Sequence, residues 1–113
     1  MLKNRSWVIV NLTVAAILAN LVLSNSPLRA QDGAALYKTK CAACHGPDGK
    51  GETAIGKANK VRDLGSAEVQ KQSDAEVTTI IETGKGKMPG YAKSLKTEQV
   101  KELVAYVRSM AKK

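Results

Sequence analysis

One short run of residues limits what this chain can become more than any other. Cys41 and Cys44 are separated by two residues, and His45 follows directly. Two thiols and an imidazole therefore lie together on one short segment. The fold has to be compatible with whatever these three side chains bind.

Four chemistries fit a C-x-x-C-H run. Two cysteines of an exported protein can form a disulfide. A thioredoxin-like redox pair belongs in a βαβ setting, and the sequence has no alternating apolar run long enough for a strand. Zinc requires four ligands, but the chain offers two Cys and one His, with only carboxylates to complete the set. The fourth chemistry is covalent attachment of haem c, with each thiol on one vinyl group and the histidine beneath the iron.

The part of the chain that contains this motif is short of core material. Residues 31–113 hold no Phe and no Trp, and their only aromatic residues are three tyrosines. Domains of this size bury a small fraction of their surface and often need an additional stabilising group, such as a disulfide or a bound metal. A haem would fill the missing centre. We therefore predict one haem c, attached to Cys41 and Cys44, with His45 as the proximal iron ligand.

The sixth position of the iron needs a different side chain, because His45 is the only histidine. Met88 lies between Gly84 and Gly90, where no helical pattern would bury it as an ordinary core residue. The alternative is that Met88 only packs against apolar neighbours, as flexible methionines do. We predict that Met88 is the distal iron ligand. Met/His ligation raises the haem potential, and with both axial positions filled, electron transfer is the natural task.

The first thirty residues have the composition of a secretory signal. A basic start precedes a mostly apolar run over residues 7–23, and a Ser- and Pro-containing break follows. We predict that residues 1–30 are a signal peptide and that residues 31–113 form the mature domain. An uncleaved membrane anchor is the alternative, but the run is shorter than the roughly 20 apolar residues of a spanning helix. Either way, the domain is expected to be periplasmic or secreted, with membrane contact only if the segment is not cleaved.

The charge of the domain favours protein partners. Without the three basic residues of the signal, fifteen basic and ten acidic residues remain, a net charge of +5. The lysines are scattered and the compartment is wrong for nucleic acid, so we expect none to bind. Opposite charges speed the encounter of proteins. We expect a monomer whose redox partner proteins present an acidic docking patch, with Lys85 and Lys87 beside Met88 orienting the contact.

The first half of the domain predicts short helices and a loop. Asp32 is a suitable N-cap for a helix that runs into Cys41. Glycines and a proline predict an irregular loop over residues 46–56. Residues 66–71 predict a brief helical piece.

The second half predicts two longer helices, so the fold class is all-α. Ser73 and Glu76 form a capping box for a helix that ends at Gly84, and a loop follows to Pro89. Thr97 is predicted to cap the last helix. Its apolar face consists of Val100, Leu103, Val104 and Val107.

With these motifs, residues 31–113 resemble the small bacterial class I cytochromes c. C-A-A-C-H, the later K-M-P-G and the final V-K-E-L-V-A-Y-V-R-S match that family in order and approximate spacing. The resemblance implies the cytochrome c fold, in which three to five short helices wrap around one covalently attached haem and leave one haem edge exposed.

The resemblance also implies particular contacts. The first and last helices should cross at a small residue and an aromatic residue, here Gly33 and Tyr106. The ring N–H of His45 should donate to the carbonyl of Pro47, which fixes the ring and raises its basicity. Some members of the wider family have a Trp near a haem propionate, and this domain has none. The candidates for propionate partners are Lys57 and Arg62.

We therefore predict a one-electron carrier, not an enzyme, that cycles iron between the ferric and ferrous states. Two other functions stay open. A gas-binding or peroxidase-type haem protein needs an open sixth site, so ligation by Met88 opposes it. A dedicated cytochrome subunit of a dehydrogenase or oxidase complex has the same chemistry, and the sequence does not separate it from a free carrier.

Overall fold

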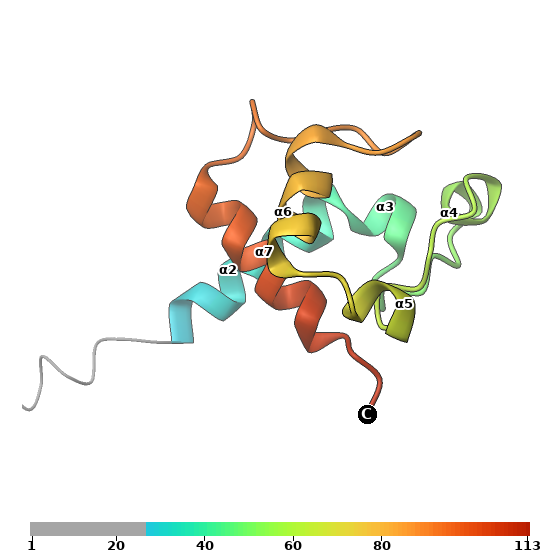
Figure 1. Cartoon of the computed structure of the whole chain (residues 1–113), viewed down its shortest axis with the longest axis horizontal. Coiled ribbons are helices and arrows are strands. Elements are labelled where there is room, and N and C mark those ends of the chain that lie inside the picture. Colours follow the sequence, from blue (N-terminus) through green and yellow to red (C-terminus); the bar gives the residue numbers. More distant parts are fainter. Residues whose placement is uncertain (1–26) are drawn as a thin grey trace, which may run out of the picture.

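A computed structural model describes residues 27–113 of the chain (Figure 1). The predicted signal segment lies outside the described residues except for its last four. Within the described part, the only β-type pairing is one bridge between Lys85 and Met88, so the all-α class is confirmed. No helix in residues 27–113 has the length and apolar character needed to cross a bilayer. The helices are α2 (Pro27–Lys40), α3 (Ala42–His45), α4 (Ala54–Ala58), α5 (Ala67–Gln70), α6 (Asp74–Thr83) and α7 (Thr97–Ser109).

The first helix is longer than the sequence predicted. It begins at Pro27, a residue type that suits the first turn of a helix, so Asp32 lies inside α2 and does not cap it. The helical run is interrupted at Cys41, which is the N-cap of the single-turn α3. The N–H groups of Cys44 and His45 both donate to the Cys41 carbonyl, at 3.2 and 2.9 Å. The motif therefore has a short helix of its own.

A second single-turn helix, α4, occupies the end of the predicted loop over residues 46–56. The side chain of Thr53 caps it by accepting a hydrogen bond from the Gly56 N–H at 2.9 Å. The sequence analysis did not predict this cap, because the many glycines nearby indicated an irregular loop. With α3 and α4 counted, the described residues form six helices, where three to five were expected.

The expectations for α5 and α6 are confirmed. Ser66 caps α5. The Ser73 hydroxyl accepts from the Glu76 N–H at 3.1 Å, and the Glu76 carboxylate accepts from the Ser73 N–H at 2.6 Å. These hydrogen bonds to Ser73 lower the pKa of Glu76. The helix ends at Gly84 as predicted.

The start of α7 differs by one residue from the prediction. Lys96, not Thr97, is the N-cap. The Gln99 side-chain oxygen accepts a hydrogen bond from the Lys96 N–H at 2.9 Å. The backbone N–H at the start of the helix is therefore satisfied by an amide side chain three residues later, and the Thr97 hydroxyl is not the cap. The predicted apolar face is confirmed, and all four of its members are buried: Val100, Leu103, Val104 and Val107.

The core forms where α7 packs against α2 and α6 (Figure 1). The crossing with α2 is close, because a β-carbon on Gly33 would lie 2.6 Å from the Glu102 carbonyl oxygen. One turn along, the rings of Tyr37 and Tyr106 stand 5.0 Å apart, tilted by 52°. The expected crossing of the first and last helices at a small residue and an aromatic residue is confirmed.

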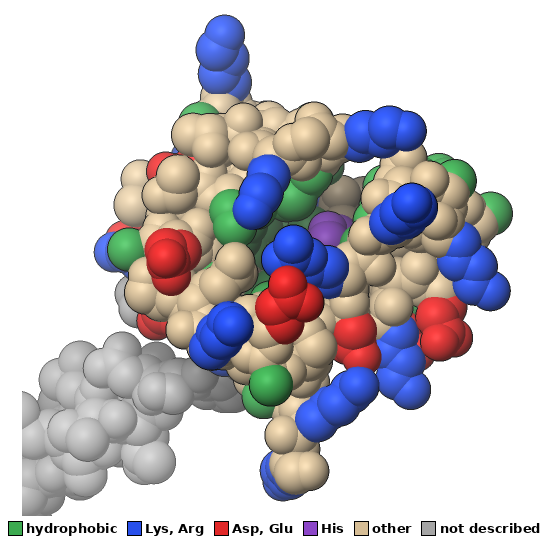
Figure 2. All heavy atoms as spheres, turned by 45° about the vertical axis from the view of Figure 1, so that its right-hand side comes forward, with side chains coloured by type: hydrophobic (Ala, Val, Ile, Leu, Met, Phe, Trp, Pro, Cys, Tyr) green, Lys and Arg blue, Asp and Glu red, His purple; other side chains and the backbone are tan. Residues whose placement is uncertain are grey.

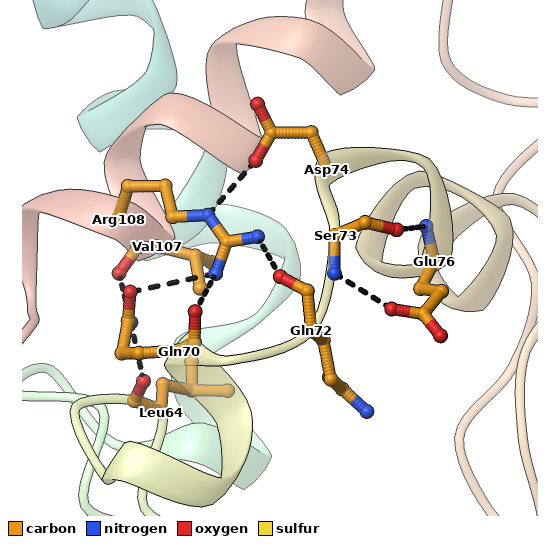
Figure 3. Close-up of polar contacts among 8 residues, drawn as sticks. All are labelled: Leu64, Gln70, Gln72, Ser73, Asp74, Glu76, Val107 and Arg108. Carbon is orange, nitrogen blue, oxygen red and sulfur yellow. Dashed lines mark hydrogen bonds and ion pairs between the residues drawn. The ribbon is translucent and has the colours of Figure 1, made fainter.

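Arg108 fastens the end of α7 to the connection between α5 and α6 (Figure 3). Its guanidinium donates to the Asp74 carboxylate at 2.9 Å, to the Gln70 carbonyl at 3.1 Å and to the Gln72 carbonyl. The Gln70 amide in turn donates to the carbonyls of Leu64, at 2.7 Å, and Val107, at 3.0 Å. This network links the end of α7 to the end of α5 and the start of α6.

Candidate haem-binding site

A cavity of about 300 Å³ lies between α3, α6 and the segments that follow α4 and α6. Figure 2 shows the hollow, with the histidine side chain inside it and hydrophobic and basic side chains around it. Residues from both ends of the domain contribute to the wall. All four predicted site residues line this cavity: Cys41, Cys44, His45 and Met88.

The wall of the cavity is mainly apolar, which suits a large and mostly apolar ligand. Leu103 of α7 forms part of it and is 1% exposed, so the cavity borders the hydrophobic core directly. The other aliphatic side chains come from α5, α6, α7 and the segment before α5. They are Val61, Leu64, Val69, Val77, Ile80, Ile81 and Val107.

His45 is the last residue of α3, and its ring nitrogen Nδ1 is buried without a hydrogen-bond partner among the described residues. Burial lowers the pKa of this imidazole, which favours the neutral form that binds metals. The expected hydrogen bond to the Pro47 carbonyl is not formed, so that expectation is wrong for this structure. The chain turns at Gly46, whose φ is +80°, and the turn leaves Pro47 exposed.

The two cysteines do not form a disulfide with each other, and each is half-buried in the cavity wall. Burial raises the pKa of Cys41 to about 11. Among the described residues, no group of three His, Cys, Asp or Glu side chains could hold a metal ion. The donor set therefore fits haem attachment better than a zinc site.

Met88 is presented by a tight turn after α6. The N–H of Lys85 donates to the Met88 carbonyl at 3.1 Å, and the N–H of Met88 donates to the Lys85 carbonyl at 3.0 Å. Gly86, at the corner, has a φ of +58°. A β-carbon on Gly84 would lie 2.4 Å from the Met88 carbonyl oxygen. The turn is thus held against the end of α6, with Met88 in the cavity wall.

Met110, the other methionine among the described residues, lies elsewhere. Its sulfur packs where a β-carbon on Gly49 would be, and it does not line the cavity. Only Met88 is placed in the same cavity as His45.

Basic side chains line the cavity on its solvent side (Figure 2). Arg62 is one of them, but it forms an ion pair with Glu68 at 3.1 Å. Lys57, the other candidate for a propionate partner, does not line the cavity. The basic rim, as we call it, consists of Lys40, Lys60, Arg62, Lys85 and Lys87, all of them exposed.

The structure adds two side chains that the sequence analysis missed. Thr53 donates its hydroxyl to the Cys44 carbonyl at 3.0 Å. Tyr37 donates to the Gly46 carbonyl at 2.6 Å. In the sequence, Thr53 and Tyr37 stand out only as polar residues close to the motif, and such residues are too common to predict a specific contact. Both bonds join residues nine positions apart through a turn that the sequence does not specify.

Comparison with known proteins places the chain among c-type cytochromes. Residues 28–107 match the family described as cytochrome c oxidase, cbb3-type, subunit III. The cbb3-type oxidase subunit CcoP of Rubrivivax gelatinosus is 39% identical over 95 residues, which cover 80% of this chain and 30% of CcoP. Cytochrome c6 of Aphanizomenon flos-aquae is 32% identical over 79 residues, which cover 70% of this chain and 87% of that cytochrome. A solved c-type cytochrome, KustC0563, has 37% identity and a TM-score of 0.67, covering 72% of this chain and 99% of its own.

The chain thus spans about a third of CcoP but nearly the whole of the small cytochromes. The coverage of the small cytochromes and the shared fold both support one assignment. The chain belongs to the cytochrome c family and carries covalently bound haem c.

Proposed function

We propose that this chain is a periplasmic electron carrier whose haem is attached through Cys41 and Cys44 and ligated axially by His45 and Met88. The observation that carries the proposal is that these four side chains, from two distant segments, line one apolar cavity. When bound, the haem iron supplies one-electron chemistry between its ferric and ferrous states. Similarity to cytochrome c6 over most of that protein's length supports a carrier rather than an enzyme.

The chain's own residues suit this task in two ways. The short turn at Met88 holds the thioether in place, so little geometry has to change between redox states. The apolar walls disfavour additional positive charge and therefore favour the reduced state, and a thioether ligand acts in the same direction.

The cavity gives little support to peroxidase or gas-binding chemistry. Both need an open sixth position, and Met88 lies in the cavity wall. The cavity contains no second histidine, because the sequence has only one. Its one arginine, Arg62, is paired with Glu68. Within the part of the chain that the structure describes, the cavity thus offers neither a second histidine nor an unpaired arginine to act on a bound peroxide.

Optical spectra of the exported, haem-loaded protein test this function. We expect haem that resists acid–acetone extraction, a weak far-red iron–thioether band when oxidised, and no rapid binding of carbon monoxide when reduced. Extractable haem would contradict the attachment. A missing band with immediate carbon monoxide binding would favour the gas-binding or peroxidase alternative.

The N-terminal assignment is part of the same proposal. Residues 1–30 are proposed to be removed on export, which leaves a domain of residues 31–113. The mass of the exported protein measures this directly. A mass that includes residues 1–30, with the protein in the membrane fraction, would support an anchor instead.

A second function is supported by the family match and by the similarity to CcoP. In it, the chain serves as a cytochrome subunit of an oxidase complex. Purification of the tagged chain from its native membranes in mild detergent separates the two. Stoichiometric oxidase subunits would favour this second function, and an isolated cytochrome favours the free carrier.

The basic rim is proposed to orient the cavity mouth toward an acidic partner. Reversal of Lys85 and Lys87 to glutamate should slow electron transfer to such a partner at low salt by about tenfold, the lower end of the range for electrostatic steering. The salt dependence of the rate should also weaken. Stopped-flow kinetics over a range of ionic strengths measures both.

Lys93 and Lys96 provide the matched control. They are exposed and do not line the cavity, and their reversal changes the net charge by the same amount. Equal slowing by both double variants would assign the effect to net charge alone and would reject the role of the rim.

A further inference from the structure

Tyr37 contacts the C-x-x-C-H segment from a separate helix. Its hydroxyl donates a 2.6 Å hydrogen bond to the carbonyl of Gly46, the residue directly after His45. Tyr37 is only 2% exposed. Burial raises the pKa of its phenol well above the ordinary value, so the hydroxyl remains a donor over the working range of pH.

The hydrogen bond from Tyr37 is one of several that hold the backbone carbonyls next to the histidine. Three consecutive carbonyls each accept a hydrogen bond from outside α3: the Cys44 carbonyl from the Thr53 hydroxyl at 3.0 Å, the His45 carbonyl from the Gly51 N–H at 2.8 Å, and the Gly46 carbonyl from Tyr37. Thr53 and Gly51 belong to the loop that follows the motif, and the Gly46 carbonyl also accepts from the Gly49 N–H of that loop, at 3.1 Å. Of the donors to these three carbonyls, only Tyr37 belongs to the helical core.

The His45 ring depends on its backbone for orientation. Its Nδ1 atom has no hydrogen-bond partner in the described part of the chain. A ring without a polar partner takes its direction from its rotamer and from the backbone that carries it. The groups that fix the backbone on either side of His45 therefore fix the imidazole.

Tyr37 is itself held firmly. Its ring packs against Tyr106 of α7, and the two helices cross closely at Gly33. Its hydroxyl therefore has a defined position relative to the core. The bond to Gly46 transmits this position to the motif.

We propose that Tyr37 is a positioning residue for His45, which sets the direction in which the imidazole faces the cavity by fixing the Gly46 carbonyl. This inference rests on the proposed function, in which His45 binds the haem iron. A phenylalanine at position 37 would fill the same space and pack against the same ring. It would lack only the donor.

The test compares Tyr37→Phe with Tyr106→Phe in the haem-loaded protein. Tyr106 belongs to the same aromatic pair, and its hydroxyl makes no hydrogen bond within residues 27–113. Amide hydrogen exchange by NMR reports the opening of the segment at the N–H groups of His45 and Gly46. Because a typical hydrogen bond changes such an equilibrium by about two- to tenfold, Tyr37→Phe should raise these exchange rates roughly three- to tenfold. Tyr106→Phe should leave them within about twofold of the unmodified protein.

A second readout distinguishes positioning from general stability. Tyr37→Phe should move the hyperfine-shifted resonances of the His45 ring, which depend on ring orientation, and Tyr106→Phe should not. Equal changes in both variants, or no change in either, would overturn the proposal. If Tyr37→Phe does not accumulate with haem, the hydroxyl proton of Tyr37 in the unmodified protein decides. A slowly exchanging signal supports the bond, and its absence overturns it.

The outcomes for the proposed function and for Tyr37 are separable. If the unmodified protein lacks the iron–thioether band or loses its haem on extraction, the proposed ligation fails. If those signatures are present and Tyr37→Phe changes neither the exchange nor the ring resonances, only the positioning role fails.

Discussion

Replacing Met88 with leucine is expected to abolish the far-red iron–thioether band and to open the sixth position to carbon monoxide. Leucine has nearly the volume of methionine but no sulfur, so the cavity wall stays filled while the ligand is lost. Such a swap changes stability by less than about 1.5 kcal/mol. The reduction potential should fall by a sizeable part of the roughly 0.8 V range that axial ligands set. Optical spectra and a redox titration of the haem-loaded variant measure these effects.

Met110→Leu is the matched control for that experiment. Met110 is half-buried and packs near Gly49 and Leu64, away from the cavity. Its replacement should keep the band and the potential, with a similar small change in stability. Retention of the band in Met88→Leu, or its loss in Met110→Leu, would remove Met88 from the ligand set.

Gly33→Ala is expected to destabilise the fold, although it should strengthen the helix in isolation. Alanine is favoured over glycine within a helix by about 1 kcal/mol. Here, however, the new β-carbon would lie 2.6 Å from the Glu102 carbonyl oxygen. Backbone cannot swing aside as a side-chain tip does, so α2 and α7 must separate. Overpacking of this kind costs about 1–3 kcal/mol, and the clash should outweigh the gain in propensity. Denaturant unfolding of the haem-loaded protein, followed by circular dichroism, measures the balance.

The exposed neighbour Ala35 provides the comparison, because Ala35→Gly on the same helix meets no such contact. That variant should lose about 1 kcal/mol through propensity alone. The two substitutions run in opposite directions, yet both are expected to lower the free energy of unfolding. A Gly33→Ala protein that is more stable than the unmodified one would show that the helix crossing tolerates a methyl group.

Some features of this protein depend only on residues that are close in the sequence, and the sequence by itself determined them. The C-x-x-C-H run fixes the order and nearness of its three side chains, whatever the rest of the chain does. The Ser73–Glu76 box and the apolar face of α7 were predicted because capping and helical periodicity act over a few residues. The cap of α7 was missed by one position, because Gln99 competes with Thr97 for the helix start.

Other features depend on contacts between distant segments, and only the tertiary structure decided them. The sequence shows Met88 and Met110 as two thioethers downstream of the motif. The turn at Gly84 and the packing of Met110 on Gly49 place just one of them in the cavity. The Pro47 carbonyl is close to His45 in sequence, yet the turn at Gly46 carries Pro47 to the surface and brings the Gly46 carbonyl to Tyr37. Local patterns set which side chains are available, and the packing of α2, α6 and α7 selects those that meet, because long-range contacts depend on the path of the whole chain.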